Sequence, residues 1–190
     1  MDGARSQKNV NPKIKIMKTT FKLNKQEIDN LISAMEQNAE RAVMLELTLT
    51  NWLAEFDNTG MVQTPIGIVK MGENQYNKII EKKRQKEFGM IKPTLTNPDV
   101  ILEMPSRAKD GDMTERPSSL LFVKTFYYGS RIVKFFTSVT VKKEGMEVVV
   151  SNHIETRKGF VNDVKKSVLV YKNERLTSNS SDLSSTENQD

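Results

Sequence analysis

The chain contains no cysteine and a single histidine, His153. The absence of cysteine excludes disulfide bonds, catalytic thiolates and zinc sites built on cysteine. One histidine also excludes a metal site that takes several histidine ligands from one chain. Chemistry in this protein therefore has to come from carboxylates, hydroxyl groups, lysine, arginine and His153.

Long apolar runs are also missing, because no stretch approaches the roughly 20 residues needed to cross a bilayer. The N-terminal segment MDGARSQKNVNPKIKIMK is basic and lacks the apolar core of a secretory signal. We therefore expect a cytoplasmic protein without membrane contacts. The 190 residues, 37% hydrophobic and 28% charged, are typical of one soluble globular domain with loose ends.

Charge is distributed unevenly along the chain, which has a formal net charge of +5. The Ser/Asn-rich segment 173–190 carries one cation against four carboxylates, so the positive excess lies in the rest of the chain. Such an excess favours polyanionic partners. We expect a basic flexible arm over 1–20, a single domain over 21–172 and a disordered acidic tail over 173–190.

Helical signals dominate the first half of the chain. Asn24 and Glu27 form a capping-box pattern that predicts a helix from about Lys25 to about Leu47. A short helix around Trp52 should follow, and then one over 72–88, ended by Gly89. Its Lys82–Lys86 run is by default a solvated face, with phosphate binding as the second choice. We expect Lys92–Asp99 to be a rigid, proline-bounded loop.

Strand signals dominate the second half. Leu120–Tyr128, Ile132–Lys142 and Met146–Asn152 are rich in β-branched and aromatic residues and are separated by glycine-containing turns, as in consecutive hairpins. Val100–Met104 and Val164–Lys172 are two further strand candidates, and Ile154–Asp163 is a basic loop or the start of a short helix. The whole pattern predicts an α+β fold, with N-terminal helices followed by an antiparallel sheet.

Strand alternation suggests where polar chemistry could gather. If helices cover only one face of the sheet, the open face should offer cations, hydroxyls, a carboxylate and the imidazole. The expected residues on that face are Lys124, Lys134, Ser138, Glu147, Ser151 and His153.

This set suits metal-independent cleavage of RNA, in which the 2′-OH attacks the adjacent phosphorus and the leaving 5′-oxygen takes a proton. Histidine titrates near neutral pH and is apt for moving these protons. A second proton carrier would be Glu, Tyr or Lys, or would be dispensable. From spacing alone, His153 is equally well explained as an ordinary histidine at a strand end.

Several stretches resemble a family of nuclease domains encoded by phages and mobile elements, in the barnase/EndoU/colicin/RelE-like superfamily. The resemblance covers most of residues 21–153 and is carried by LNKQEIDNLISAMEQNAERAVMLELT, TPIGIVKMGENQYNKI, FGMIKPTLTNPDVI, ERPSSLLFVKTF and FTSVTVKKEGMEVVVSNH. It implies N-terminal helices followed by a curved antiparallel sheet of four or five strands. It also implies a metal-independent ribonuclease with no cofactor, acting in conflicts between cells, phages or plasmids.

Matching positions imply the following roles. His153 would be the general acid or base, Lys124 and Arg116 would bind the scissile phosphate, and Ser138 and Ser151 would help to orient it. The substrate-binding residues would be Gln75, Lys78, Ser119 and Thr137 at matching positions, and Lys82, Arg84 and Lys134 are added from the basic helix run and the open face of the sheet.

One position departs from the family pattern, because Ile68 stands where members usually have a glutamate. The hypothesis is therefore a small RNA endonuclease, with RNA as its partner and an immunity protein as a possible second one. The alternative is a catalytically inactive nucleic-acid-binding or interaction module of a mobile-element protein. The sequence leaves the oligomeric state open.

Overall fold

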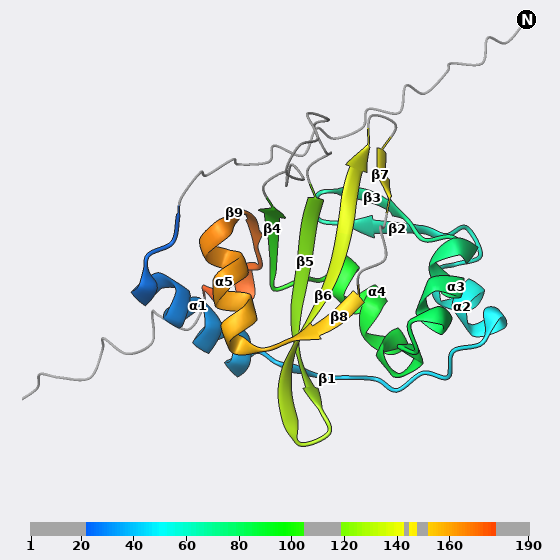
Figure 1. The fold of residues 1–190 in the computed structure, drawn as a ribbon, viewed down its shortest axis with the longest axis horizontal. Helices are drawn as coiled ribbons and strands as arrows, with labels where there is room; N and C mark the ends of the chain where they lie inside the picture. Colours follow the sequence, from blue (N-terminus) through cyan, green and yellow to red (C-terminus); the bar gives the residue numbers. More distant parts are fainter. Residues whose placement is uncertain (1–21, 105–118, 143–144, 148–151, 178–190) are drawn as a thin grey trace, which may run out of the picture.

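The computed structural model describes residues 22–104, 119–142, 145–147 and 152–177 (Figure 1). Within them, the strands are β1 (Glu40–Arg41), β2 (Met61–Thr64), β3 (Gly67–Lys70), β4 (Val100–Met104), β5 (Ser119–Tyr128), β6 (Arg131–Lys142), β7 (Gly145–Glu147), β8 (Asn152–Glu155) and β9 (Val168–Lys172). They form one sheet in the order β2-β3-β7-β6-β5-β4-β9, with β1 paired to β5 and β8 paired to β6.

The helices of the described residues are α1 (Lys25–Gln37), α2 (Leu49–Glu55), α3 (Glu73–Glu81), α4 (Phe88–Thr96) and α5 (Arg157–Lys166), with short 3-10 turns η1 (Gln85–Glu87) and η2 (Glu174–Leu176). All strand pairs are antiparallel except β1–β5 and β3–β7. The predicted α+β class, with N-terminal helices followed by an antiparallel sheet, is confirmed. The sheet has more strands than the four or five predicted.

The central hairpin of the sheet is the part that the sequence predicted best. Strands β5 and β6 pair over their length, from Ser119 opposite Thr140 to Tyr128 opposite Arg131. The third predicted strand differs, because β7 and β8 are separate short strands that both pair with β6. As a result His153 lies inside β8, two residues before the strand ends.

Helix α1 begins as predicted and ends earlier. The Asn24 side chain accepts a hydrogen bond from the Glu27 backbone N–H at 3.0 Å, and the Glu27 carboxylate accepts one from the Asn24 N–H at 2.7 Å. The helix stops at Gln37 because the chain then turns into β1, which pairs in parallel with β5. Sheet pairing there outweighs the apolar periodicity that predicted a longer helix.

Helices cover both faces of the sheet. One core cluster joins α2, α3 and α4 to sheet residues that include Phe122, Phe126 and Phe135. The other joins α1 and α5 to residues that include Val123 and Phe136 on the opposite face. The condition under which an open polar face was expected, helices on one face only, is therefore not met. Helix α5 is a full helix where a loop or short helix start was predicted.

Helix α4 occupies a segment where the sequence predicted a stop and a loop. Gly89 does not end a helix, and Pro93 is contained in one. Phe88, Ile91 and Leu95 are buried, and their burial outweighs the unfavourable propensities of glycine and proline. Gly89 is required by a close approach, because a Cβ there would lie 2.0 Å from the Val43 carbonyl oxygen.

We expect Gly89→Ala to lower the free energy of unfolding by about 2–3 kcal/mol, because the added methyl group must displace backbone rather than a flexible side chain. Urea titration followed by circular dichroism measures this change. The matched control is Gly72→Ala, where the nearest atom is the Gln75 side-chain oxygen at 3.2 Å, with an expected change of about 0.5 kcal/mol or less. Equal effects would contradict the proposed clash.

Candidate active site

Strand β8 brings the only histidine and a carboxylate to the same face of the sheet. His153 and Glu155 are two residues apart in an extended strand, so their side chains point the same way. His153 Nε2 lies 3.5 Å from Glu155 Oε2, and the two side chains are 30% and 28% exposed. The imidazole packs edge-on against Phe136, with 5.1 Å between ring centroids. The pair is therefore held by the core and reachable from solvent.

The Glu155 carboxylate is fixed by the start of α5. Its Oε1 atom accepts a hydrogen bond from the Thr156 backbone N–H at 2.9 Å, which leaves Oε2 toward His153. The Thr156 hydroxyl in turn caps α5 by accepting from the Gly159 N–H at 3.1 Å. A Cβ on Gly159 would lie 2.1 Å from Glu155 Oε1, so glycine leaves room for the carboxylate to lie against the helix. Helix α5 thus orients the residue that contacts the imidazole.

Lys134 lies directly across the strand pair from Glu155 and is almost fully buried. Its Nζ atom contacts Glu36 Oε1 of α1 at 2.9 Å and lies 5.9 Å from the centroid of the Phe160 ring. Glu36 also faces Arg157 at 3.7 Å. Lys134 therefore connects α1 to β6 through an ion pair next to the His153–Glu155 pair. Its charge is already balanced by the Glu36 carboxylate.

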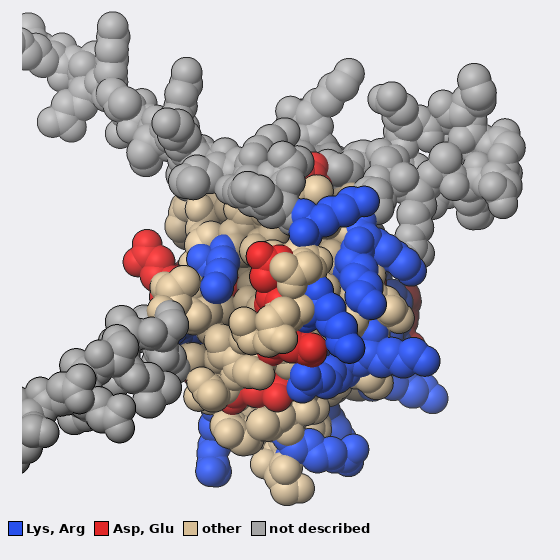
Figure 2. All heavy atoms as spheres, turned by 90° about the vertical axis from the view of Figure 1, so that its left-hand side faces the viewer, with Lys and Arg blue, Asp and Glu red and all other residues tan. Residues whose placement is uncertain are grey.

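Exposed cations border the pair on α5. The helix carries Arg157, Lys158, Lys165 and Lys166 on its exposed surface. Figure 2 shows Lys and Arg side chains gathered on its right-hand side, which corresponds to the front of Figure 1, and acidic side chains in a band nearer the centre. This distribution suits a polyanion that passes across the front of the sheet.

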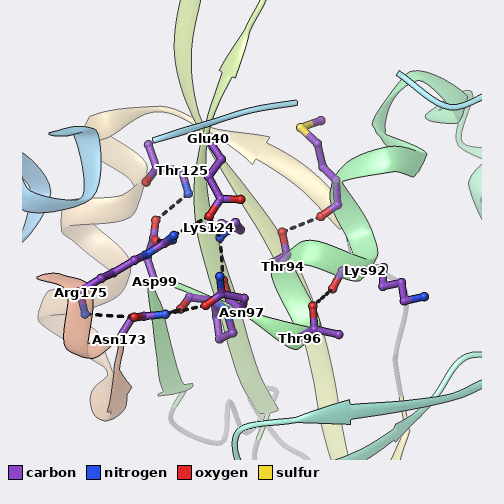
Figure 3. A network of polar contacts seen from close by, with 12 residues as sticks. Glu40, Lys92, Thr94, Thr96, Asn97, Asp99, Lys124, Thr125, Asn173 and Arg175 are labelled. Atoms are coloured by element: carbon purple, nitrogen blue, oxygen red, sulfur yellow. Dashed lines mark hydrogen bonds and ion pairs between the residues drawn. The ribbon is translucent and has the colours of Figure 1, made fainter. Parts of the chain in front are cut away.

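Lys124 lies on the other face of the sheet, contrary to the expectation that it shares a face with Lys134 and His153. It is opposite Phe135 in the register and is fully buried. Its ammonium donates to Glu40 Oε1 at 2.9 Å and to the Asn97 carbonyl at 2.8 Å (Figure 3). The physical reason is strand parity: Lys124 is an even position of β5, on the side of Phe122 and Phe126.

The network around Lys124 includes a second buried charge, Asp99 (Figure 3). Asp99 accepts from the Thr125 N–H at 2.7 Å and from Arg175 of η2 at 2.5 Å. Arg175 also donates to Glu40 at 2.5 Å. The fold thus continues through Thr177, and the prediction that the ordered domain ends at residue 172 is wrong for this short segment.

Burial and pairing act against each other in this network. Burial raises the pKa of Asp99 despite the hydrogen bonds from Arg175 and Thr125, and burial lowers the pKa of Lys124. Partial burial of Glu40 acts to raise its pKa, but hydrogen bonds from Lys124 and Arg175 outweigh it and lower the pKa. We interpret these four charged residues as a structural clasp that fastens β1 and η2 to the sheet.

The other predicted substrate-binding residues are scattered. Gln75 is buried at the start of α3, where its Oε1 accepts from the Gly72 N–H at 2.7 Å. Lys78 is exposed on α3, and Lys82 is exposed just beyond it. Arg84 donates to the Asn152 carbonyl, which places its guanidinium next to the strand that carries His153.

Polar residues of β5 and β6 divide between the two faces of the sheet. Thr137 is buried opposite Asn152, on the face away from His153. Ser138 is half-buried on the face of Lys134, and Ser119 is half-buried at the start of β5. Arg116 and Ser151 lie outside the described residues, as does the side chain of Glu147. The catalytic and binding roles of all these residues remain predictions.

Ile68 lies on β3 with its side chain 53% exposed. Its neighbour Val69 is buried in the cluster that includes Phe135, so Ile68 points to the opposite face, which is the face of His153. The position at which the resemblance implies a glutamate is therefore on the same side of the sheet as the histidine pair, with β7 between β3 and β6.

Glu155 is the site residue that the sequence analysis missed. The signal was present as strand alternation, because residues two apart in an extended segment share a face. The predicted strand Met146–Asn152 ends before Glu155, so this residue falls in the segment Ile154–Asp163, predicted as a basic loop or the start of a short helix.

In the part of the chain that the structure describes, no helix is long and apolar enough to cross a membrane.

Sequence comparison connects the chain to a known protein family. The model of the family described as phage-Barnase-EndoU-ColicinE5/D-RelE like nuclease 2 matches residues 51–172. Neither a search of curated proteins nor a search of solved structures found a match. The matched range covers more than half of the chain and runs from α2 through β9, including β8 and α5. The chain therefore belongs to the phage-Barnase-EndoU-ColicinE5/D-RelE like nuclease 2 family.

Proposed function

We propose that the protein is a metal-independent RNA endonuclease in which His153 moves the protons. The observation that carries the proposal is the contact of 3.5 Å between His153 Nε2 and Glu155 Oε2, on the half-exposed face beside the basic helix α5. An imidazole that contacts a carboxylate has its ring orientation fixed, as proton transfer to and from a substrate requires. Membership of a nuclease family supports the same reaction class.

In the proposed reaction, His153 takes the proton of a ribose 2′-OH while that oxygen attacks the adjacent phosphorus. The bond from phosphorus to the 5′-oxygen breaks, and the imidazolium returns the proton to this leaving oxygen. The products are a 2′,3′-cyclic phosphate and a free 5′-hydroxyl. Glu155 holds the imidazole ring in place for both transfers. Because both of its oxygens have partners, we assign Glu155 as a positioning residue rather than a second base.

Exposed cations of α5 bind the negatively charged backbone of the RNA. The exposed side chains of Arg157 and Lys158 at the start of α5 lie closest in sequence to the pair, and Lys165 and Lys166 extend the surface along the helix. Lys124 is not assigned a role in phosphate binding, because its ammonium is buried on the other face and bonded to Glu40. These cations bind backbone and carry no sequence preference.

The test of this proposal uses the purified full chain and a single-stranded RNA in the presence of EDTA. We expect fragments that end in a 2′,3′-cyclic phosphate, identified by mass spectrometry, and no cleavage of the same sequence with 2′-O-methyl groups. Cleavage that requires a divalent metal, or equal cleavage of the 2′-O-methyl strand, would overturn the mechanism.

A second candidate is a nucleic-acid-binding module without activity, which is favoured by Ile68 on the face of His153. It predicts that RNA stays intact while binding weakens steeply with salt.

A further inference from the structure

A row of exposed side chains crosses three strands at the tip of the β5–β6 hairpin. Tyr127 of β5 is opposite Ile132 of β6 on one side and Arg41 of β1 on the other. Residues that are directly opposite in a sheet point to the same side, so these three form one surface. Tyr127 and Ile132 are 43% and 42% exposed, and Arg41 is also exposed.

This row lies on the same face of the sheet as the candidate active site. Along β6, Ile132, Lys134 and Phe136 alternate onto one face, and Phe136 is opposite His153. Phe136 is four positions beyond Ile132 in the strand, a distance of about 13 Å. An extended strand of RNA bound at His153 can therefore span the distance to the row, passing outside the buried Lys134 and its partner Glu36.

The surroundings of the row favour a nucleic acid over an apolar partner. Arg41 is part of the row and is exposed, and it lies directly across the strand pair from Tyr127. Figure 1 shows this end of the hairpin projecting below β1. Two carboxylates lie beside Lys134, which is between the row and His153 on this face: Glu155 is opposite it, and Glu36 is paired with both Lys134 and Arg157. An accessible aromatic ring beside a cation is an arrangement that stacks a base and holds a phosphate.

We propose that Arg41, Tyr127 and Ile132 form a subsite that binds an unpaired base of the RNA, with the base stacked on Tyr127 and a phosphate held by Arg41. This inference rests on the proposed nuclease function and names its substrate class as single-stranded RNA. Bases in a duplex have their faces covered by neighbouring pairs, so they offer nothing to stack on Tyr127. Ile132 would support the edge of the same base by apolar contact.

The experiment measures binding apart from cleavage. The probe is a 2′-O-methyl RNA oligonucleotide that contains one 2-aminopurine, titrated with the full chain. We expect quenching of the 2-aminopurine fluorescence by the wild type. We expect Tyr127→Ala to weaken binding by about 5- to 150-fold, as loss of one base–aromatic stack does, and Tyr127→Phe to bind within about threefold of wild type. Arg41→Gln should reduce the slope of log Kd against log salt by about 0.7.

The matched control is Leu53→Ala on α2, because Leu53 has the same exposure, 43%, and belongs to a helix on the other face of the sheet. This variant should bind the single-stranded probe as tightly as the wild type does. All variants should bind a duplex competitor with the same affinity as the wild type. Unchanged binding by Tyr127→Ala, or full recovery by Tyr127→Leu, would overturn the subsite, the latter by showing that apolar area alone is needed. If the wild-type protein quenches the probe through Tyr127 but does not cleave RNA, only the nuclease mechanism would be overturned.

Discussion

Replacing His153 with alanine is expected to slow RNA cleavage by about 10²- to 10⁴-fold, the contribution that a positioned general acid or base typically makes. The imidazole is the group that takes and returns the proton, and the chain contains no other histidine to replace it. Single-turnover rates with saturating protein measure the effect without interference from binding. His153 is 30% exposed, so we expect the variant to fold.

The control for this variant comes from the same strand. Ile154 follows His153, is 37% exposed and points to the opposite face of β8. Ile154→Ala changes a side chain of similar exposure and should retain a cleavage rate within about twofold of wild type. A loss of cleavage in Ile154→Ala as large as that in His153→Ala would show that strand β8 matters for folding rather than for proton transfer.

Glu155→Gln separates positioning from substrate binding. Glutamine keeps an oxygen that accepts from the Thr156 N–H, and it removes the negative charge beside the imidazole. Because Glu155 contacts His153 and not the RNA in our proposal, kcat should fall while KM stays close to the wild-type value. A rise in KM with unchanged kcat would contradict the assigned role.

Replacing Asp99 with alanine is expected to lower the free energy of unfolding by about 3–5 kcal/mol. The carboxylate is fully buried and accepts hydrogen bonds from the Thr125 N–H and from Arg175. Removing the carboxylate leaves the Thr125 N–H without an acceptor and deprives the Arg175 guanidinium of one of its two carboxylate partners. Unpaired buried groups of this kind are costly. Urea unfolding measures the change.

Two further variants test whether the loss of stability comes from the buried contact between Asp99 and Arg175. Asp29→Ala breaks an exposed ion pair, in which Asp29 lies 3.3 Å from Arg157, and should cost about 0.2–1 kcal/mol. The double variant Asp99→Ala, Arg175→Met should cost less than the sum of the two single substitutions, because each residue is the other's partner. Strict additivity would show that the two residues act independently.

The loss in Asp99→Ala should also depend on pH. Burial raises the pKa of Asp99 above its ordinary value of 3.8, so the folded protein binds this proton more tightly than the unfolded chain. The stabilisation from this carboxyl is then complete at pH values below its ordinary pKa. It decreases as the pH rises through the raised pKa of the folded protein. The difference between wild type and variant should therefore be larger at about pH 4 than at pH 7. A difference that grows with pH would show that Arg175 outweighs burial.

Local signals in the sequence predicted the elements that short-range chemistry controls. The capping box at Asn24 and the hairpin of β5 and β6 depend on residues close in sequence, and the structure confirms both. Helix α1 was predicted too long because its end depends on pairing with β5, which lies far along the chain. Helix α4 was missed because tertiary burial of Phe88 and Leu95 overrides the local effect of glycine and proline.

Only part of the candidate site followed from the sequence. His153 was found by its rarity, and strand parity correctly placed it on one face with Lys134. Parity within one strand does not say which faces of neighbouring strands coincide, and that is why Lys124 was placed on the wrong side. The link from Arg175 to Asp99 spans 76 residues and has no local signature.

The two-residue strand β1 has a consequence for how copies of this protein meet. Strand β4 covers the edge of β5 only as far as Val123, and the Asp99 carboxylate occupies the Thr125 N–H beyond that point. Strand β1 then pairs with Phe126 and Tyr127. The edge is thus closed by a strand, a side chain and a second strand in succession. A long exposed edge is a template for pairing with another chain, and here that route to aggregation is blocked although no single strand spans it.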